Sequence, residues 1–149
     1  MHRDPNCVFC DIVHGDGDAH IIYRDELVTA FLDINPVNPG HTLVIPNAHS
    51  ASIQEVPDGA CGQLFVIGRD LDKAIRKTDL RCEAVNLYLA DGRAAGQAVF
   101  HTHLHVIPRY RGDSSGLRLH ADPPHTPSSD SLSEQARKVV AAFQNVHAN

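Results

Sequence analysis

The sequence predicts an α+β fold in which an antiparallel sheet of about five strands packs with two main helices. Three observations carry this prediction: short apolar segments separated by turn residues, one long segment with apolar residues at helical spacing, and a second such segment near the end of the chain. With 149 residues, 42% hydrophobic and 21% charged, the chain has the size and composition of one globular domain. We therefore expect a single domain over residues 1–149.

Segments rich in β-branched and aromatic residues, bounded by turn residues or proline, predict the strands. The predicted strands are 21–23, 28–33, 42–45, 84–89 and 103–108. Residues 35–40 contain two prolines, which fix φ, and end in Gly40, which permits a positive φ. This segment predicts a sharp turn between the second and third strands.

Two segments have apolar residues on one side of a helix and polar residues on the other, which predicts helices over 60–77 and 132–144. Ser131 or Ser133 is expected to cap the second helix. Residues 112–131 are rich in proline and serine and predict a loop. The residues that carry chemical motifs all lie before this loop, within residues 6–111.

Composition excludes several classes of function. The net charge is −5 and the 13 basic residues are scattered, which argues against a nucleic acid as the partner. No apolar run approaches the roughly 20 residues of a membrane span, and the first residues lack the apolar region of a secretory signal. We therefore expect a cytoplasmic protein that binds neither nucleic acid nor membrane. Its four cysteines are then expected to be reduced.

Three of the 11 histidines alternate along one predicted strand: His101, His103 and His105. Because side chains of a strand point alternately to its two faces, these three share one face, while the residues between them share the other. The alternative is a solvated face that carries histidines without a function. It fits poorly with the apolar residues on the opposite face.

A single metal ion held by all three histidines is a second alternative. Side chains on one face lie about 6.6–6.8 Å apart, so His101 and His105 are expected roughly 13 Å apart. Zinc–nitrogen bonds are only about 2.0–2.1 Å long. Neighbouring histidines could share an ion, but all three could not. The strand is therefore expected to serve two sites, one at each end.

Cys7 and Cys10 offer two thiolates at metal-ligand spacing. A structural zinc takes four nitrogen or sulfur ligands in a closed tetrahedron. His49, just after the third predicted strand, and His101, at the start of the histidine strand, are expected to complete the set. The alternative is a pair of buried, reduced cysteines without a metal. The other two cysteines have no partner at such spacing.

The segment 101–107, His-Thr-His-Leu-His-Val-Ile, resembles the His-φ-His-φ-His-φ-φ signature of the histidine triad (HIT) nucleotide-binding proteins, where φ is an apolar residue. Four further segments resemble other blocks of that family in order and spacing: 7–10, 31–34, 39–46 and 95–100. The first of these resembles the N-terminus of the zinc-containing bacterial members. The resemblance implies an antiparallel α+β fold, a homodimer whose two sheets join, and a purine nucleotide substrate.

The resemblance also implies an activity and the residues that perform it. The implied activity is hydrolysis or transfer of a nucleoside monophosphate from a phosphoramidate, a dinucleoside polyphosphate or a similar conjugate. His103 would be the nucleophile that takes the nucleotidyl group. The residues implied at the phosphate are His105, His41 and Gln97. The residues implied at the ribose and the base are Asp33, Phe31 and Ile34. The implied zinc ligands are Cys7, Cys10, His49 and His101.

The residue types support this chemistry independently. A neutral imidazole is a competent nucleophile towards phosphorus, provided that its other ring nitrogen holds the proton and has an acceptor for it. Charge on the phosphoryl oxygens then needs preorganised donors, and the backbone N–H groups near Gly96 are candidates beside the histidines. The sequence contains neither a P-loop nor a clustered pair of acidic magnesium ligands.

The chain departs from the family pattern at two positions. Ala90 and Ala98 stand where many members carry side chains that donate hydrogen bonds to the phosphate. Loss of one such bond costs about 0.5–1.5 kcal/mol. A nucleotide-binding or regulatory module with weak or no turnover is therefore the alternative function. A third hypothesis is a zinc-dependent hydrolase in which His103 and His105 hold a catalytic metal.

Overall fold

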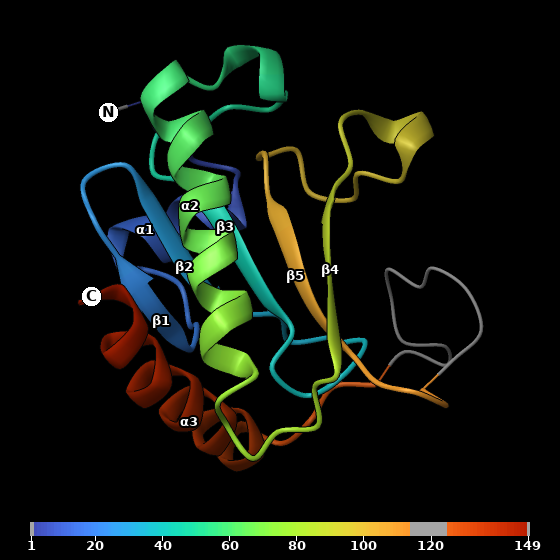
Figure 1. The fold of residues 1–149 in the computed structure, drawn as a ribbon. Coiled ribbons are helices and arrows are strands. Elements are labelled where there is room, and N and C mark those ends of the chain that lie inside the picture. The colour runs from blue at the N-terminus through green and yellow to red at the C-terminus, as the bar shows by residue number, and fades with distance from the viewer. Residues whose placement is uncertain (1, 114–124, 149) are drawn as a thin grey trace.

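One antiparallel sheet with helices on both faces forms the protein, as the computed structural model of residues 2–113 and 125–148 describes it (Figure 1). The strand order is β1-β2-β3-β5-β4. The strands are β1 (Ile21–Arg24), β2 (Val28–Leu32), β3 (Thr42–Pro46), β4 (Ala84–Leu89) and β5 (Leu104–Arg109). The helices are α1 (Val8–His14), α2 (Asp58–Ile75) and α3 (Ser129–His147), with short 3₁₀ turns at Ile53–Glu55 and Arg93–Ala95. The α+β prediction is confirmed.

The helix α1 is absent from the sequence prediction. It has only seven residues, and it follows directly on Cys7, so the Cys-x-x-Cys pattern concealed its helical spacing. It ends at Gly15, which adopts a φ of 83° that few other residues tolerate. α1 lies on the face of the sheet opposite to α2 and α3 (Figure 1).

The two predicted helices are present with shifted ends. α2 begins two residues earlier than expected, at Asp58, and ends at Ile75. α3 begins at Ser129, so the predicted loop 112–131 is wrong for its last three residues. Ser128 is the cap, because its Oγ accepts a hydrogen bond from the N–H of Ser131, and neither predicted serine has that role. Residues 114–124 of the predicted loop lie outside the described residues.

Side chains of the central strands point alternately to the two faces of the sheet, and this produces two separate hydrophobic cores. On one face, Ala30, Val44 and Leu104 pack beneath α2 and α3. On the other face, Phe31 and Leu43 pack against α1. His101, His103 and His105 form a row that we call the histidine row. Since β5 begins at Leu104, only His105 of this row belongs to the strand ladder, and His101 and His103 precede it. All three histidine rings are nevertheless buried.

None of the helices in the described part of the chain is long and apolar enough to cross a membrane. The sheet has two edges, and they differ in cover. At β1, Tyr23 packs on Phe143 of α3, with ring centroids 5.1 Å apart. At β4, every residue is exposed or half-buried.

Candidate active site and metal centre

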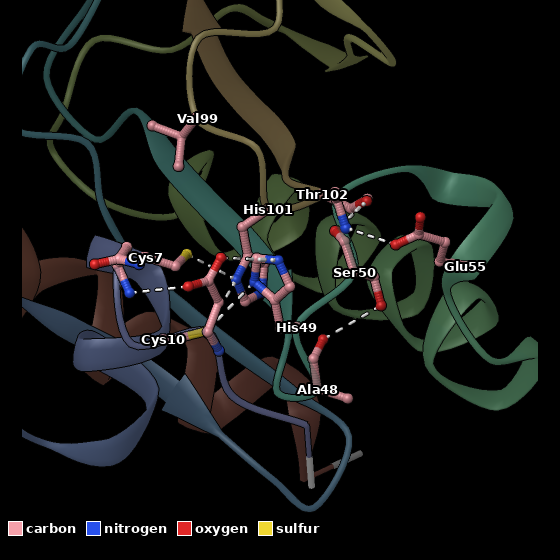
Figure 2. Close-up of polar contacts among 12 residues, drawn as sticks. Cys7, Cys10, Ala48, His49, Ser50, Glu55, Val99, His101 and Thr102 are labelled. Carbon is pink, nitrogen blue, oxygen red and sulfur yellow. Dashed lines mark hydrogen bonds and ion pairs between the residues drawn. The ribbon is translucent and has the colours of Figure 1, made fainter.

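Cys7, Cys10, His49 and His101 converge beside the N-terminus of α1. The Cys7 Sγ lies 3.4 Å from Nδ1 of His101, and the Cys10 Sγ lies 3.4 Å from Nδ1 of His49. The Cys10 Sγ is also 3.7 Å from Nδ1 of His101. Figure 2 shows the two cysteines facing the two imidazole rings. In tetrahedral zinc with Zn–S and Zn–N bonds of normal length, sulfur and nitrogen ligands are about 3.6 Å apart.

The bonds around this cluster leave the right atoms available for a metal. Nε2 of His101 donates to the backbone oxygen of Pro46 at 2.8 Å, so the lone pair of this neutral ring is on Nδ1, which faces the sulfurs. Burial lowers the pKa of His101 to about 4 and therefore favours the neutral ring that a metal requires. Burial raises the pKa of the Cys10 thiol, and a bound cation would oppose that effect. The four residues fit a closed metal site.

A second chain of hydrogen bonds connects the loop after β2 to the histidine row. The backbone N–H of Val37 donates to Nδ1 of His41 at 3.0 Å, so the neutral His41 ring carries its proton on Nε2. That Nε2 lies 2.9 Å from Nδ1 of His105 and donates to it. The neutral His105 ring must then carry its own proton on Nε2. The chain of bonds thus supplies His105 with an N–H donor on its Nε2 side.

His103 has the opposite tautomer. Its Nδ1 lies 2.7 Å from the backbone oxygen of His101, and because a carbonyl oxygen only accepts, Nδ1 must hold the proton. The lone pair of the neutral ring is therefore on Nε2. The ring stacks edge-on against Phe9 and His105, with centroids 5.3 and 4.9 Å away. A nucleophilic nitrogen and an N–H donor on adjacent rings are the arrangement that attack on a phosphoryl group needs.

A cleft of about 370 Å³ opens beside these two histidines. Its walls are mostly apolar, and Asp18, Asp33 and Asn35 are polar residues that line it beside the histidines. Among the predicted site residues, the structure brings five to this cleft. They are Phe31, Asp33, Ile34, His103 and His105. Ala98, at one of the two departures from the family pattern, also lines it.

Gln97 and Gly96 are not among the described residues that line the cleft. The side-chain oxygen of Gln97 accepts from the N–H of Gly92, and its amide nitrogen donates to the carbonyl oxygens of Ala51 and Val99. The bonds to Gly92 and Val99 hold the segment around the 3₁₀ turn Arg93–Ala95, and the bond to Ala51 ties this segment to the loop after β3. In this structure Gln97 therefore stabilises its own loop and does not reach toward the histidines.

Phe9 is a site residue that the sequence reasoning did not identify. It lies on α1 between the two cysteines, lines the cleft, and packs edge-on against Phe31 and His101 at centroid distances of 5.4 and 5.9 Å. Its ring therefore packs between the metal cluster and the cleft. The spacing of Phe9 and Ile12, which lie on one side of α1, is the signal that could have identified it.

Asp33, His41 and His105 form a second group of potential ligand atoms, each within 4.8 Å of the others. The hydrogen bonds argue against a metal there. Nδ1 of His41 is engaged by the N–H of Val37, which leaves the proton on the Nε2 that a metal would need. The groups of potential metal ligands found among the described residues do not include His103. This arrangement does not favour the zinc-dependent hydrolase hypothesis.

Comparison with known proteins agrees with this geometry. The family model "HIT domain" matches residues 14–112. "Protein hit" of Bacillus subtilis is 39% identical over 145 residues, which cover 95% of this chain and 99% of that protein. A Zn-bound histidine triad family protein from Mycobacterium smegmatis superposes with a TM-score of 0.81 at 37% identity, covering 96% of each chain. "Adenylylsulfatase HINT3" of Arabidopsis thaliana is 36% identical over 124 residues, 78% of this chain and 60% of that protein.

The fold, the row of histidines and these matches define one class of protein: the chain belongs to the HIT domain family. This family includes the Arabidopsis thaliana protein named as an adenylylsulfatase and the Mycobacterium smegmatis protein described as Zn-bound.

Proposed function

We propose that the protein hydrolyses or transfers a nucleoside monophosphate group from a nucleotide conjugate, through a covalent nucleotidyl intermediate on His103. The observation that carries this proposal is the hydrogen bond from Nδ1 of His103 to the backbone oxygen of His101. It puts the proton on the nitrogen that faces the backbone and leaves Nε2 as an uncharged nucleophile.

The reaction is proposed to proceed in two displacements. Nε2 of His103 attacks the α-phosphorus, the bond to the leaving group breaks, and the leaving group departs with that electron pair and takes a proton from water. Nδ1 of His103 keeps its proton throughout, and its bond to the carbonyl oxygen of His101 stabilises the positive charge that the ring gains. Water or another hydroxyl acceptor then attacks phosphorus and releases its proton to solvent, the N–P bond breaks with its electron pair returning to Nε2, and the neutral imidazole is restored. Nε2–H of His105 donates to the phosphoryl oxygens in both steps.

The cleft supports a purine nucleoside as the group that is held. Phe9, Phe31 and Ile34 line it and offer faces on which a flat base can pack. Asp33 lines the same cleft as the two histidines, and its carboxylate can accept the two hydroxyls of a ribose. The name of the Arabidopsis thaliana relative, adenylylsulfatase, supports adenylyl conjugates as substrates to test.

We propose that zinc occupies the cluster of Cys7, Cys10, His49 and His101 and stabilises the fold. The ligand types, their spacing and the Zn-bound relative support this assignment. With four protein ligands the site has no open position, so zinc would hold α1 against the start of the histidine row and would take no part in the displacement. The thiolate ligands require a reducing compartment, which supports the cytoplasm as the location.

The covalent intermediate is the direct test. The protein is mixed with adenosine phosphoramidate, quenched with base, in which phosphohistidine survives, and digested for mass spectrometry. We expect a mass increase of one adenylyl group on His103, with none in His103→Asn. The matched control is His125→Asn, a substitution of an exposed histidine outside the cleft, which should label like the wild type. Turnover without any labelled histidine peptide would contradict the proposal.

A nucleotide-binding module with weak turnover remains the second candidate, and a specific observation favours it. Ala98 lines the cleft without a hydrogen-bonding side chain, and the Gln97 amide is engaged with the backbone. The phosphate would therefore have fewer donors than the family pattern supplies. Nucleotide binding by calorimetry, together with no detectable turnover on a panel of phosphoramidates and dinucleoside polyphosphates, would support this candidate over the enzyme.

We also propose a homodimer in which the sheets of two copies join along β4. Leu87 of this edge strand is 41% exposed, and Phe65 and Val66 of α2 are also exposed apolar residues. An edge strand with open hydrogen-bonding groups and nearby apolar side chains is a surface that a second copy can extend. Light scattering should give twice the chain mass, and Leu87→Lys should reduce it. A monomeric wild-type protein would contradict this arrangement.

A further inference from the structure

The loop between β2 and β3 carries Asp33, which lines the cleft and which we propose binds the ribose, and His41, which bonds to the histidine row. Asp33 begins the loop and His41 ends it, and the two are joined by a hydrogen bond from the N–H of Asp33 to the carbonyl oxygen of His41, at 2.9 Å. The N–H of Val37 in the same loop fixes the tautomer of His41. The position of this loop therefore determines the geometry of the hydrogen bond from Nε2 of His41 to Nδ1 of His105.

A side chain from α3 holds this loop from outside. Oε1 of Gln135 accepts the backbone N–H of Gly40 at 3.0 Å, 95 residues away in the sequence. Gln135 is only 7% exposed, and its Nε2 donates to Oγ of Ser131 one turn earlier, which orients the amide. In Figure 1 the orange segment that leads into α3 crosses the end of the sheet where β3 begins. α3 lies beyond residues 14–112, which the family model matches.

The bond from Gln135 acts on Gly40, the residue directly before His41. Gly40 has a φ of 91°, and a Cβ there would approach Leu80 Cδ1 to 3.1 Å and Pro108 Cγ to 3.4 Å, so the backbone is already closely packed. A glycine at positive φ has little intrinsic preference for that conformation, so its hydrogen bonds select it: Thr42 Oγ1 donates to its carbonyl oxygen from within the chain segment, and Gln135 accepts its N–H from outside. The buried N–H of Gly40 finds its acceptor in Gln135.

We propose that Gln135 is a positioning residue for the His41–His105 pair. Its amide oxygen fixes the Gly40 peptide, Gly40 fixes the direction in which His41 leaves the loop, and Nε2 of His41 then reaches Nδ1 of His105 at 2.9 Å. The C-terminal helix is thereby a working part of the active site. This inference rests on the proposed function, in which Nε2–H of His105 donates to the phosphoryl oxygens.

The test compares variants that differ in one property, the acceptor at position 135. Gln135→Met keeps the shape and removes the strong acceptor, whereas Gln135→Glu keeps an acceptor, to which Ser131 can donate. Loss of one buried hydrogen bond that acts on the transition state corresponds to about a two- to tenfold fall in rate. We expect kcat of Gln135→Met to fall by this amount with a smaller change in KM, and Gln135→Glu to recover most of the loss. Gln144→Met, at an exposed position of the same helix, is the matched control and should behave as wild type.

Two further readouts keep the inference open to refutation if turnover is absent or a variant folds poorly. Long-range ¹H–¹⁵N spectra of the imidazoles report the tautomers of His41 and His105, and these should change in Gln135→Met and not in Gln144→Met. Ser131→Ala, which leaves Gln135 in place and releases its orientation, should weaken protection of the Gly40 amide from hydrogen exchange. Gln135→Met with a wild-type kcat, or with wild-type His41 and His105 tautomers, would overturn the inference. A wild-type protein without turnover would refute the proposed function, and the spectra would still decide the role of Gln135.

Discussion

Two neighbouring histidines of the row, His101 and His103, use the same side chain for different chemistry. At the metal end, Nε2 of His101 is bonded to a backbone oxygen, and Nδ1 faces two cysteine sulfurs. In the middle of the row, Nδ1 of His103 is bonded to a backbone oxygen, and Nε2 is the nucleophile that we propose. Both rings are buried. In each ring, the backbone oxygen that accepts a hydrogen bond from one nitrogen therefore determines which group the other nitrogen faces.

His41 and His105 add a third arrangement, in which one ring donates to the next. The N–H of Val37 sets the direction of that chain, because it can only donate. A metal ion needs lone pairs that converge, and proton donation needs N–H groups in series. The described residues include a cluster of each kind, with Phe9 packed between His101 and His103.

The largest expected effect separates the metal cluster from the proposed nucleophile. His103→Asn removes the proposed nucleophile and should lower kcat by at least about 10³-fold, while metal content and thermal stability stay near wild type. Steady-state hydrolysis of a phosphoramidate and metal analysis of the same sample measure both. A variant that keeps more than a tenth of wild-type activity on every substrate tested would break the distinction.

Cys10→Ala should act on the metal end. We expect loss of zinc and a fall of roughly 3–4 kcal/mol in the free energy of unfolding, which lowers Tm by roughly 6–16 °C. Cys61→Ala is the matched control, since Cys61 lies on α2, outside the cluster. Unchanged zinc stoichiometry in Cys10→Ala would show that the cluster is misassigned.

The metal-free protein should be sensitive to acid because of His101. Its pKa is about 4 in the folded protein, against 6.5 ordinarily, so between these values the unfolded chain binds a proton that the folded chain does not. The stability that the neutral ring contributes is present above pH 6.5 and is lost as the pH falls toward 4, by roughly 3 kcal/mol. Urea unfolding of metal-free wild type and metal-free His101→Gln, from pH 7 to 4, measures it. Equal pH slopes would contradict the prediction.

The smallest expected effect concerns the two side chains that hold the loop between β2 and β3. Oγ1 of Thr126 donates to Oδ1 of Asn35 at 2.7 Å, an exposed counterpart of the buried bond from Gln135 to Gly40. Exposed substitutions usually change stability by less than about 0.5 kcal/mol, so Thr126→Ala should change kcat less than about twofold. A loss as large as that of Gln135→Met would mean that burial does not distinguish the two anchors.

Features of the fold and the site that depend on residues close together in the sequence could be predicted more readily than contacts between distant residues. The strand 84–89 was predicted with both ends correct, because its residue types and flanking turns are local signals. The spacing of Cys7 and Cys10 is equally local. The sequence also predicts that His49 and His101 complete their ligand set. The structure brings these four residues together. Whether they bind zinc stays a prediction.

The features that escaped prediction depend on distant or backbone groups. Gln135 meets a backbone N–H 95 residues earlier, which no spacing rule detects. The tautomer of His41 depends on the N–H of Val37, a group that every residue except proline has. Gln97 was expected at the phosphate, but its side chain is surrounded by backbone acceptors and a donor, so it bonds within its own loop and to Ala51, 46 residues earlier.

The central claim is that an uncharged imidazole, that of His103, captures the nucleotidyl group before water does. The stereochemical course at phosphorus tests it most directly. An adenosine phosphorothioamidate of known configuration is hydrolysed in ¹⁸O-labelled water, and the configuration of the labelled thiophosphate product is determined. Two successive in-line displacements predict overall retention. Inversion would mean a single direct attack by water and would contradict the mechanism.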